Sequence, residues 1–381
     1  MAFSAISDEA SSDDARFMHA ALTFGRRGLG RTAPNPSVGA LLVKDGVIIS
    51  RGVTAPGGRP HAETQALDAA GERARGATLY VTLEPCSHYG HTKPCADAIV
   101  TAGVARVVIA CGDPDPRVAG RGIERLRTAG IAVIRGILAD QARQDHAGHI
   151  RRVVERRPFI TLKIAETADG FAASPSGDPR LLITGAMANA WVQGQRALHD
   201  AVLVGAGTAR ADDPRLDVRL PGMEADQPVR VVFDAAASIP LTGRLVMSAA
   251  RSPVVVVAGP HAASARVEAL RAAGVHVVSS PLDQDGRLDL AAALRHLAGG
   301  LTRVFCEGGP RLGAALLVSG YADEVAVLTG PVAFSRAGLA AFDPAGRTIL
   351  NDRERYRLVE DRMLGPDRLR RFEKVERCSQ A

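Results

Sequence analysis

The sequence predicts an α/β fold in two domains, and three observations support that fold class. Short apolar runs rich in valine and isoleucine alternate with helical patterns, which is typical of sheets covered by helices. The chain has 381 residues, 46% of them hydrophobic, which is enough material for two separate cores. A polar and basic stretch over residues 141–157 interrupts the alternation, and we place the domain boundary there, near residue 150.

The first domain, residues 15–150, is expected to follow a polar N-terminal segment, residues 1–14, that is disordered. Asp45-Gly46 marks the turn of a β-hairpin, and Gly71 and Gly130 mark helix ends. The alternation predicts a mostly parallel sheet sandwiched between helices. The expected helices cover residues 15–29, 61–70, 95–102 and 122–129, and the expected strands cover residues 40–43, 47–49, 78–83, 106–110 and 132–135.

The second domain, residues 151–381, continues the α/β pattern but has no G-x-G-x-x-G fingerprint after a strand. Gly308-Gly309 instead precedes a helix expected from about Leu312 to Val318. Backbone N–H groups at such a helix start can bind a pyrophosphate, although a glycine pair by itself more often forms a tight turn. The expected strands cover residues 159–164, 202–204, 229–233, 253–257, 275–278, 304–306 and 324–328.

Composition narrows the partners and the compartment. The net charge of +6 fits phosphorylated small-molecule substrates, and with only 4% aromatic residues we expect no nucleic-acid partner. The chain has no apolar run of about 18 residues and no signal segment at its start, so we expect no membrane span and a cytoplasmic protein. Five cysteines, an odd number, fit a reducing compartment better than a disulfide framework.

One cluster of residue types points directly to chemistry. His61-Ala62-Glu63 is followed by Pro85-Cys86 and then by Cys95. One imidazole and two thiolates bind Zn²⁺ and leave a fourth position for water, the ligand set of zinc-dependent hydrolytic deaminases. The neighbouring glutamate, Glu63, is not a ligand: it takes a proton from that water, delivers it to a ring nitrogen, and then protonates the departing amine in a separate transfer.

An alternative reading of the same cluster is a structural zinc site. Such a site has four protein ligands, and His88 or His91, both between the two cysteines, is available as the fourth. The spacing of Glu63 from His61 favours the catalytic reading. Eight residues separate Cys86 from Cys95, whereas nucleoside and nucleic-acid deaminases have P-C-x-x-C, so the pocket rim must differ from theirs.

Several motifs together resemble the bifunctional riboflavin-biosynthesis deaminase-reductase family. They are Asn35-Pro36-Ser37-Val38-Gly39, His61-Ala62-Glu63, Leu83-Glu84-Pro85-Cys86-Ser87-His88, Asp113-Pro114-Asp115-Pro116 and Gly120-Arg121-Gly122. The resemblance implies a cytidine-deaminase-like three-layer α/β/α domain followed by a dihydrofolate-reductase-like α/β domain. It also implies Zn²⁺ and NADPH as cofactors, a diaminopyrimidinone ribosylamine 5′-phosphate as the first substrate, and a homo-oligomer.

The resemblance further implies roles for individual residues. In the first domain Asn35 holds the substrate, and His88 and His91 are candidates for the rim of its pocket. In the second, the most specific motifs are Ala211-Asp212-Asp213-Pro214 and Glu307-Gly308-Gly309-Pro310. The implied cofactor contacts are Ala165, Leu182, Thr208, Asp212, Gly308 and Gly309, and the implied substrate contacts are Arg180, Arg196, Leu216, Arg219 and Glu307. Of these, Arg196 and Arg219 can each bind a phosphate with a forked guanidinium.

The second domain departs from the family pattern more than the first. The family has Ser-Leu-Asp-Gly where this chain has Thr167-Ala168-Asp169-Gly170, and Leu182 stands where the family has tryptophan. Two rival hypotheses therefore remain at this stage. One is a deaminase whose second domain has lost or changed the reductase activity, and the other is a deaminase of nucleic-acid bases.

Overall fold

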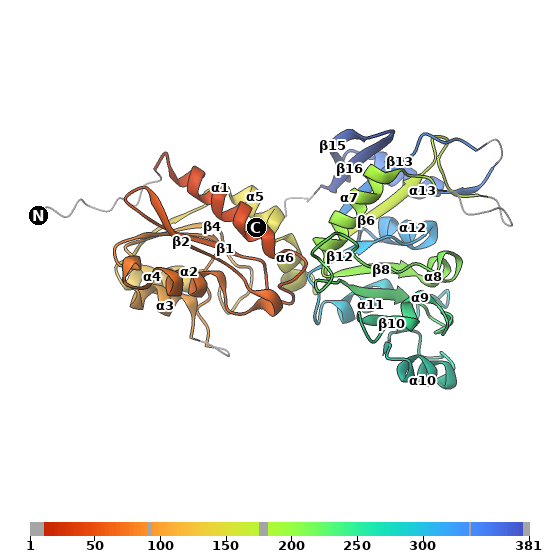
Figure 1. Cartoon of the computed structure of the whole chain (residues 1–381), viewed down its shortest axis with the longest axis horizontal. Helices are drawn as coiled ribbons and strands as arrows, with labels where there is room; N and C mark the ends of the chain where they lie inside the picture. The colour runs from red at the N-terminus through yellow and green to blue at the C-terminus, as the bar shows by residue number, and fades with distance from the viewer. Residues whose placement is uncertain (1–10, 90–92, 175–181, 335–336, 376–381) are drawn as a thin grey trace, which may run out of the picture. The chain divides into compact units, whose positions relative to one another are not determined.

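The computed structural model forms two compact units, Met1–Arg157 and Pro158–Ala381 (Figure 1). The residues that it describes are 11–89, 93–174, 182–334 and 337–375. No helix in these ranges is long and apolar enough to cross a membrane.

The first unit is built on a five-stranded sheet. Its strands are β1 (Gly39–Lys44), β2 (Val47–Val53), β3 (Thr78–Leu83), β4 (Arg106–Cys111) and β5 (Ala132–Arg135), in the order β2-β1-β3-β4-β5. β1 is antiparallel to both β2 and β3, whereas β3, β4 and β5 are parallel. The expected mostly parallel sheet holds for strand direction, because only β1 runs opposite to the other four strands, and the expected β1–β2 hairpin accounts for it.

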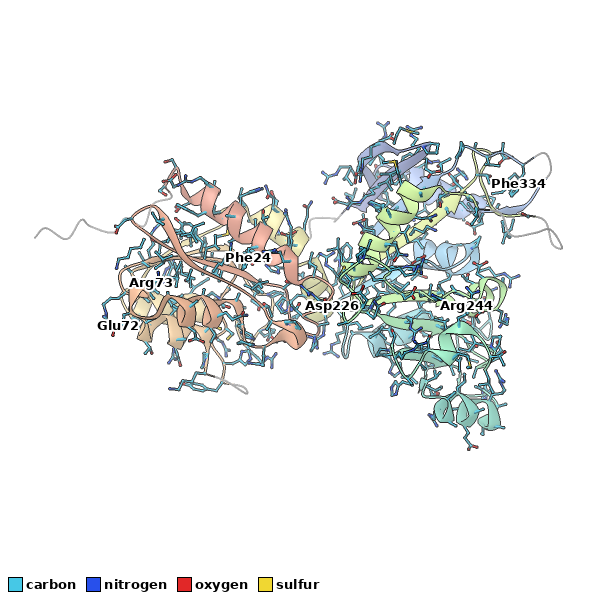
Figure 2. All side chains as sticks on the ribbon, in the orientation of Figure 1. Phe24, Glu72, Arg73, Asp226, Arg244 and Phe334 are labelled. Carbon is cyan, nitrogen blue, oxygen red and sulfur yellow. The ribbon has the colours of Figure 1, made fainter. Side chains whose placement is uncertain are left out.

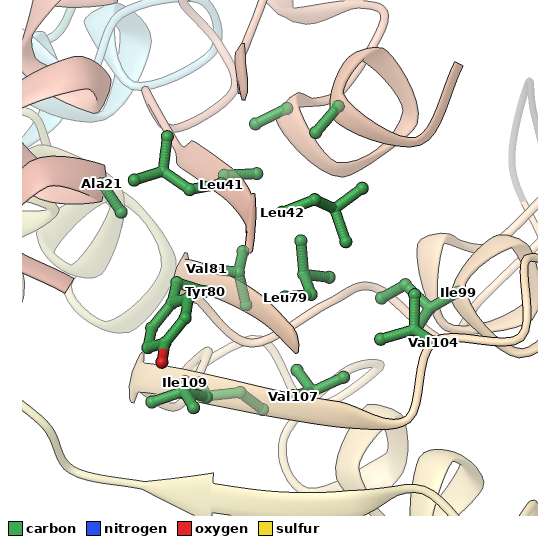
Figure 3. Packing of buried hydrophobic residues seen from close by; sticks show 14 of the residues in the cluster. Ala21, Leu41, Leu42, Leu79, Tyr80, Val81, Ile99, Val104, Val107 and Ile109 are labelled. Atoms are coloured by element: carbon green, nitrogen blue, oxygen red, sulfur yellow. The ribbon is translucent and has the colours of Figure 1, made fainter. Parts of the chain in front are cut away.

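Helices cover both faces of this sheet. They are α1 (Asp14–Gly25), α2 (Ala62–Ala70), α3 (Cys95–Thr101), α4 (Arg121–Thr128), α5 (Ala139–Asp145) and α6 (Ala147–Val154). α1 and α5 lie on one face, and α2, α3 and α4 on the other (Figure 1). Alternating strand residues serve the two layers: Leu41 points toward Ala21 of α1, while its neighbour Leu42 lies on the opposite side of β1 (Figure 3).

Two glycines let the helices lie close to the strands. A Cβ at Gly39 of β1 would lie 2.0 Å from the backbone oxygen of Ala21 in α1. A Cβ at Gly52 of β2 would lie 2.0 Å from the backbone oxygen of Ala62 in α2. Any larger residue at position 52 would push α2 outward, and α2 is the helix that begins at the predicted metal ligand His61.

The N-terminal expectation is wrong at its last residues. Asp14, which we assigned to a disordered segment, is fully buried and begins α1. Arg106 of β4 donates two hydrogen bonds to its carboxylate, at 2.8 and 2.7 Å, and the Tyr80 hydroxyl donates a third at 2.8 Å. From the sequence alone Asp14 is expected to be solvated, because its partners lie more than sixty residues further along the chain. Residues 1–10 lie outside the described part of the chain.

The polar stretch that we expected at the domain boundary is not a linker. It forms α5 and α6 of the first unit, and His146 and His149 in it are buried. His146 Nε2 lies 3.1 Å from Thr82 Oγ1 of β3. The expected boundary near residue 150 falls inside α6, and the division between the units follows Arg157.

The second unit is built on a nine-stranded sheet. Its strands are β6 (Phe159–Glu166), β8 (Ala201–Gly205), β9 (Val229–Phe233), β10 (Val254–Ala258), β11 (His276–Ser279), β12 (Arg303–Cys306), β13 (Glu324–Thr329), β15 (Tyr356–Leu364) and β16 (Asp367–Lys374), in the order β11-β10-β9-β8-β12-β6-β13-β16-β15. The seven strands from β11 to β13 are parallel, and the β15–β16 hairpin is an antiparallel edge. A separate pair joins β7 (Phe171–Ala173) to β14 (Leu339–Ala340).

Helices cover both faces of this sheet as well. They are α7 (Ala186–Ala197), α8 (Ala206–Asp212), α9 (Arg244–Met247), α10 (Ser264–Ala272), α11 (Leu290–Leu297), α12 (Pro310–Val318) and α13 (Pro344–Asn351). In the described part of this unit three hydrophobic cores result: the first contains residues of α11, α12 and α13, the second residues of α9 and α10, and the third residues of α7. Successive residues of β8 point into different cores, because Leu203 belongs to the first core whereas Val202 and Val204 belong to the second.

Candidate active sites

The three predicted metal ligands meet in the first unit. His61 Nδ1 lies 3.7 Å from the Cys86 sulfur and 3.3 Å from the Cys95 sulfur. All three donor atoms lie within 4.8 Å of one another. A tetrahedral zinc ion with Zn–S of about 2.3 Å and Zn–N of about 2.0 Å separates sulfur from nitrogen by roughly 3.5 Å. The donor types and their spacing therefore fit zinc with three protein ligands.

The ends of three elements bring the ligands together. His61 is the residue before α2, in an extended conformation, and its backbone oxygen accepts a hydrogen bond from the N–H of Gln65 in that helix. Cys86 follows the carboxyl end of β3, and Cys95 is the first residue of α3. Helix starts favour anionic groups, which suits a thiolate at Cys95. Cys86 itself lies in an irregular loop after β3.

Hydrogen bonding and burial shift the pKa values of the two predicted ligand thiols in opposite directions. Hydrogen bonds, first from Cys95 and also with His61, outweigh burial and lower the pKa of the Cys86 thiol to about 4. The pKa of Cys95 is raised, because the Cys86 hydrogen bond and burial favour its protonated form. A bound cation would favour deprotonation of Cys95 and so oppose this upward shift.

Glu63 lies in the first turn of α2, beside the ligand cluster. Its side chain is only 3% exposed. Burial is the main cause that raises the pKa of Glu63, the negative Cys86 adds to it, and the nearby His61 opposes it. A carboxyl group with a raised pKa, next to the metal ligands but not one of them, suits repeated uptake and release of a proton.

The predicted substrate contacts of the first unit are Asn35, His88 and His91. The Asn35 side chain donates a 2.9 Å hydrogen bond to the backbone oxygen of Gly58, in the loop before His61. His88 is partly buried, and its Nδ1 has no hydrogen-bond partner among the described residues. His91 lies outside the described residues. The roles of all three toward a substrate stay predictions.

The second unit contains a cleft of about 1100 Å³ at the carboxyl ends of its parallel strands. Its lining includes Ala165 at the end of β6, Thr208 after β8, and Gly308 after β12. Ligands of open α/β sheets bind at this edge. The predicted contacts that line the cleft are Ala165, Leu182, Arg196, Thr208, Asp212, Arg219, Glu307, Gly308 and Gly309. Arg180 lies outside the described residues.

Gly308 and Gly309 form a helix start. Gly309 is the residue before α12, with φ −66° and ψ 175°, a conformation open to any residue. A Cβ there would lie 2.9 Å from the hydroxyl oxygen of Thr208, so a larger residue would displace that side chain. α8 begins beside it, after the neighbouring strand β8, so two helix starts face the cleft from adjacent strands. Such an edge suits the pyrophosphate of a dinucleotide.

The Arg196 guanidinium is already hydrogen-bonded within the protein. Its guanidinium donates to both carboxylate oxygens of Glu307, at 2.6 and 3.0 Å, and to the backbone oxygen of Asp217 at 2.8 Å. Both side chains are largely buried, at 10% and 11% exposure. The forked phosphate contact that we predicted for Arg196 thus competes with a bidentate ion pair. Its direct effect in this structure is to orient Glu307 at the cleft wall.

A smaller cavity of about 340 Å³ shares Arg196, Asp212 and Arg219 with the cleft. It also contains Leu216, a predicted substrate contact, and Arg244 of α9, which is labelled in Figure 2. Arg219 forms an ion pair with Asp217, and Arg244 forms one with Asp213, which also lines the cavity. This collection of arginines suits a phosphorylated ligand.

Sequence reasoning missed part of the cleft wall. Asn189, Val192 and Gln193 of α7 line it next to Arg196. They recur at the spacing of one helix face, but two of them are polar, and nothing in the sequence tells a polar face toward a cleft from one toward solvent. Gln193 also accepts a 2.7 Å hydrogen bond from the backbone N–H of Arg219.

Two family models match the chain. The cytidine and deoxycytidylate deaminase zinc-binding region matches residues 11–111, and the RibD C-terminal domain matches residues 158–363. The chain is 37% identical to riboflavin biosynthesis protein RibD of Escherichia coli over 368 residues, which is 93% of this chain and 97% of that protein. It is 39% identical to RibD of Aquifex aeolicus over 84% of this chain and 87% of that protein.

Solved structures agree over the whole chain. Acinetobacter baumannii RibD matches with a TM-score of 0.82 at 35% identity, covering 96% of this chain and 99% of that one. A diaminohydroxyphosphoribosylaminopyrimidine deaminase/5-amino-6-(5-phosphoribosylamino)uracil reductase from Thermotoga maritima matches with a TM-score of 0.80 at 33% identity, covering 95% and 99%. These matches confirm the predicted deaminase-like and reductase-like folds. The chain therefore belongs to the RibD family of riboflavin biosynthesis, whose members combine a zinc-dependent deaminase with an NADPH-dependent reductase.

Proposed function

We propose that the first unit deaminates 2,5-diamino-6-ribosylamino-4(3H)-pyrimidinone 5′-phosphate and that the second reduces the ribosyl group of the product to ribityl. The convergence of His61, Cys86 and Cys95 around one point, with buried Glu63 beside them, is the observation that carries the first step. The cleft with two helix starts and an arginine-rich neighbour supports the second.

In the first step, the chain's own groups move protons. Zinc held by His61, Cys86 and Cys95 would supply a water molecule with a lowered pKa. The Glu63 carboxylate accepts a proton from that water and passes it to a ring nitrogen; it then takes the second proton, from the hydroxyl added to the ring carbon, and gives it to the departing amine. Ammonia leaves and a ring carbonyl remains, so one glutamate acts as both base and acid.

In the second step, the chain supplies position rather than a nucleophile. NADPH bound in the cleft would supply a hydride for C1 of the opened ribosylamine, and a proton from solvent would complete the reduction. We assign cofactor contacts to Ala165, Leu182, Thr208, Asp212, Gly308 and Gly309, and substrate contacts to Arg180, Arg196, Leu216, Arg219 and Glu307. In this scheme the ion pair between Arg196 and Glu307 keeps the part of the cleft that contacts the substrate rigid.

We also propose a cytoplasmic homo-oligomer with no nucleic-acid partner. All four cysteines in the described ranges are free, which supports a reducing compartment. The low aromatic content supports small substrates over nucleic acid. Sedimentation of the purified protein would test the oligomeric state, and a monomer at micromolar concentration would contradict it.

One assay tests both activities on the full chain. The zinc-loaded protein is incubated with the diaminopyrimidinone ribosylamine phosphate, with and without NADPH, while ammonia release and NADPH absorbance are followed together. We expect ammonia in both samples and NADPH oxidation in one. Ammonia without NADPH oxidation would contradict the reductase assignment, and the absence of ammonia would contradict the deaminase assignment.

A further inference from the structure

Glu84 is a buried carboxylate two residues before the metal ligand Cys86. Its side chain is 4% exposed. One oxygen accepts hydrogen bonds from the backbone N–H groups of Gly122, at 3.1 Å, and Ile123, at 3.4 Å. The other accepts from the N–H of Gly120, at 3.1 Å. All three donors belong to the start of α4, so Glu84 caps this helix from another part of the chain.

The start of α4 has no capping side chain of its own, and Glu84 supplies one. The first N–H groups of a helix have no partner within the helix, and the residue before α4, Gly120, has no side chain to supply one. The helix start also has a partial positive charge, which stabilises a carboxylate removed from water. Glu84 and α4 therefore stabilise each other in one relative position.

A second contact sets the distance between α4 and the metal-binding loop. A Cβ at Gly122 would lie 2.2 Å from the backbone oxygen of Pro85, so only glycine allows this approach. Gly120 is required for a different reason, because its φ of 79° is in the left-handed region. The Gly120-Arg121-Gly122 motif thus builds one tight junction between α4 and the loop that leads to Cys86.

The loop is also held by α3. The Cys86 sulfur accepts a hydrogen bond from the backbone N–H of Cys95 at 3.3 Å, and the Cys86 backbone oxygen accepts one from the N–H of Ala96 at 3.1 Å. Cys95 is placed by the helix it begins and His61 by α2. Cys86 alone is placed by an irregular loop, so its position depends on these two junctions.

We propose that Glu84 is a positioning residue for the zinc site. Its carboxylate joins the end of β3 to the start of α4 and so holds the Cys86 sulfur within reach of His61 and Cys95. Gly122 acts in the same junction by admitting the Pro85 carbonyl. The inference concerns metal binding and does not depend on which pyrimidine is deaminated, so a failed deaminase assay would leave it standing.

Zinc affinity of the full chain tests this role. Zinc is removed, and competition with a chromophoric chelator measures the affinity of the original protein and of Glu84→Ala, Glu84→Gln and Gly122→Ala. Loss of a group that positions a ligand typically weakens metal binding by about 10- to 100-fold, which we expect for Glu84→Ala and Gly122→Ala. Glu84→Gln keeps one acceptor oxygen but turns a donor toward an N–H group, so it should lie between.

A matched control separates position from charge. Glu124→Gln removes the same charge from the first turn of α4, but Glu124 is exposed. We expect its zinc affinity to equal that of the original protein. If it falls as far as that of Glu84→Gln, the effect is one of charge near the site and the proposal is overturned.

Cobalt gives a readout that helix capping alone would not change. Co²⁺ bound by two thiolates and an imidazole has a thiolate-to-metal absorption band, which should weaken or shift in Glu84→Gln and Gly122→Ala. Unchanged cobalt spectra and zinc affinities, with only a lower unfolding temperature, would show that Glu84 merely caps α4. If Glu84→Ala does not fold, Glu84→Gln decides, because full zinc affinity in that variant overturns the proposal.

Discussion

At the residue scale, Glu63 separates catalysis from metal binding. Glu63→Gln removes the group that moves protons but none of the three zinc ligands, so ammonia release should fall by about 10²- to 10⁴-fold while zinc stays bound. Ammonia assay and metal analysis of the same sample measure the two effects. The control is Glu72→Gln, an exposed glutamate after α2 that is labelled in Figure 2. Near-normal deamination by Glu63→Gln would assign the proton transfers to another group.

His199 is a buried histidine that stays neutral in the folded protein. It is 3% exposed, its Nδ1 lies 2.6 Å from the Gln195 backbone oxygen, and its Nε2 lies 3.0 Å from Thr161 Oγ1. Burial and, secondly, the charge of Arg303 lower its pKa from 6.5 to about 3. The unfolded chain therefore binds a proton at this histidine at a higher pH than the folded chain does.

The pH dependence of stability follows from that difference. The stabilisation from a neutral His199 is fully present above pH 6.5, and it is lost as the pH falls from there toward 3. The free energy of unfolding should lose up to about 1.4 kcal/mol per pH unit from this group. His199→Gln should flatten this slope in denaturation measurements between pH 7 and 5, and equal slopes in both proteins would contradict the prediction.

At the scale of elements, local patterns located most strands but not the terminal hairpin. Residues 78–83 and 229–233 were predicted with the bounds that the structure has. β15 and β16 were missed because charged residues interrupt their alternation. Those charges pair across strands: Arg371 of β16 contacts Glu324 of β13 at 3.0 Å and Glu360 of β15 at 2.8 Å. A strand whose charged residues pair with neighbouring strands can be recognised only when those partners are known, and the local sequence does not contain them.

The start of α1 offers a test of a buried ion pair. Removing one partner of such a pair leaves the other uncompensated, so Asp14→Ala should destabilise the first unit by about 3–5 kcal/mol. Asp13→Ala is the control, because the Asp13–Arg16 pair is more than half exposed and should contribute under about 1 kcal/mol. Urea denaturation followed by circular dichroism compares the two, and equal losses would show that Asp14 is not an anchor of α1.

At the scale of the whole molecule, the predicted zinc site and the cleft belong to different units. The zinc ligands all belong to residues 1–157, and the cleft is lined by residues of the second unit. Chelation of zinc should abolish ammonia release but leave NADPH-dependent reduction when the deaminated substrate is supplied directly. Loss of that reduction on chelation, with recovery on adding zinc, would show that the second activity requires the metal site.

The metal site is the part of this protein that the sequence predicts without any structure. The residue types and order of His61, Glu63, Cys86 and Cys95 are sufficient to predict it, because few reactions use that ligand set with a neighbouring glutamate. Helices and strands followed from periodicity wherever apolar residues mark the buried face.

The contacts of the buried polar residues, by contrast, become visible only in the folded chain. Asp14 is an anchor, Arg196 is held by Glu307, and Glu84 caps a helix, although each looks like an ordinary charged residue in its own segment. The physical reason is that a buried charge is stable only with its partner, and the partners here come from distant parts of the chain. Folding brings these partners together, and the local sequence does not contain them.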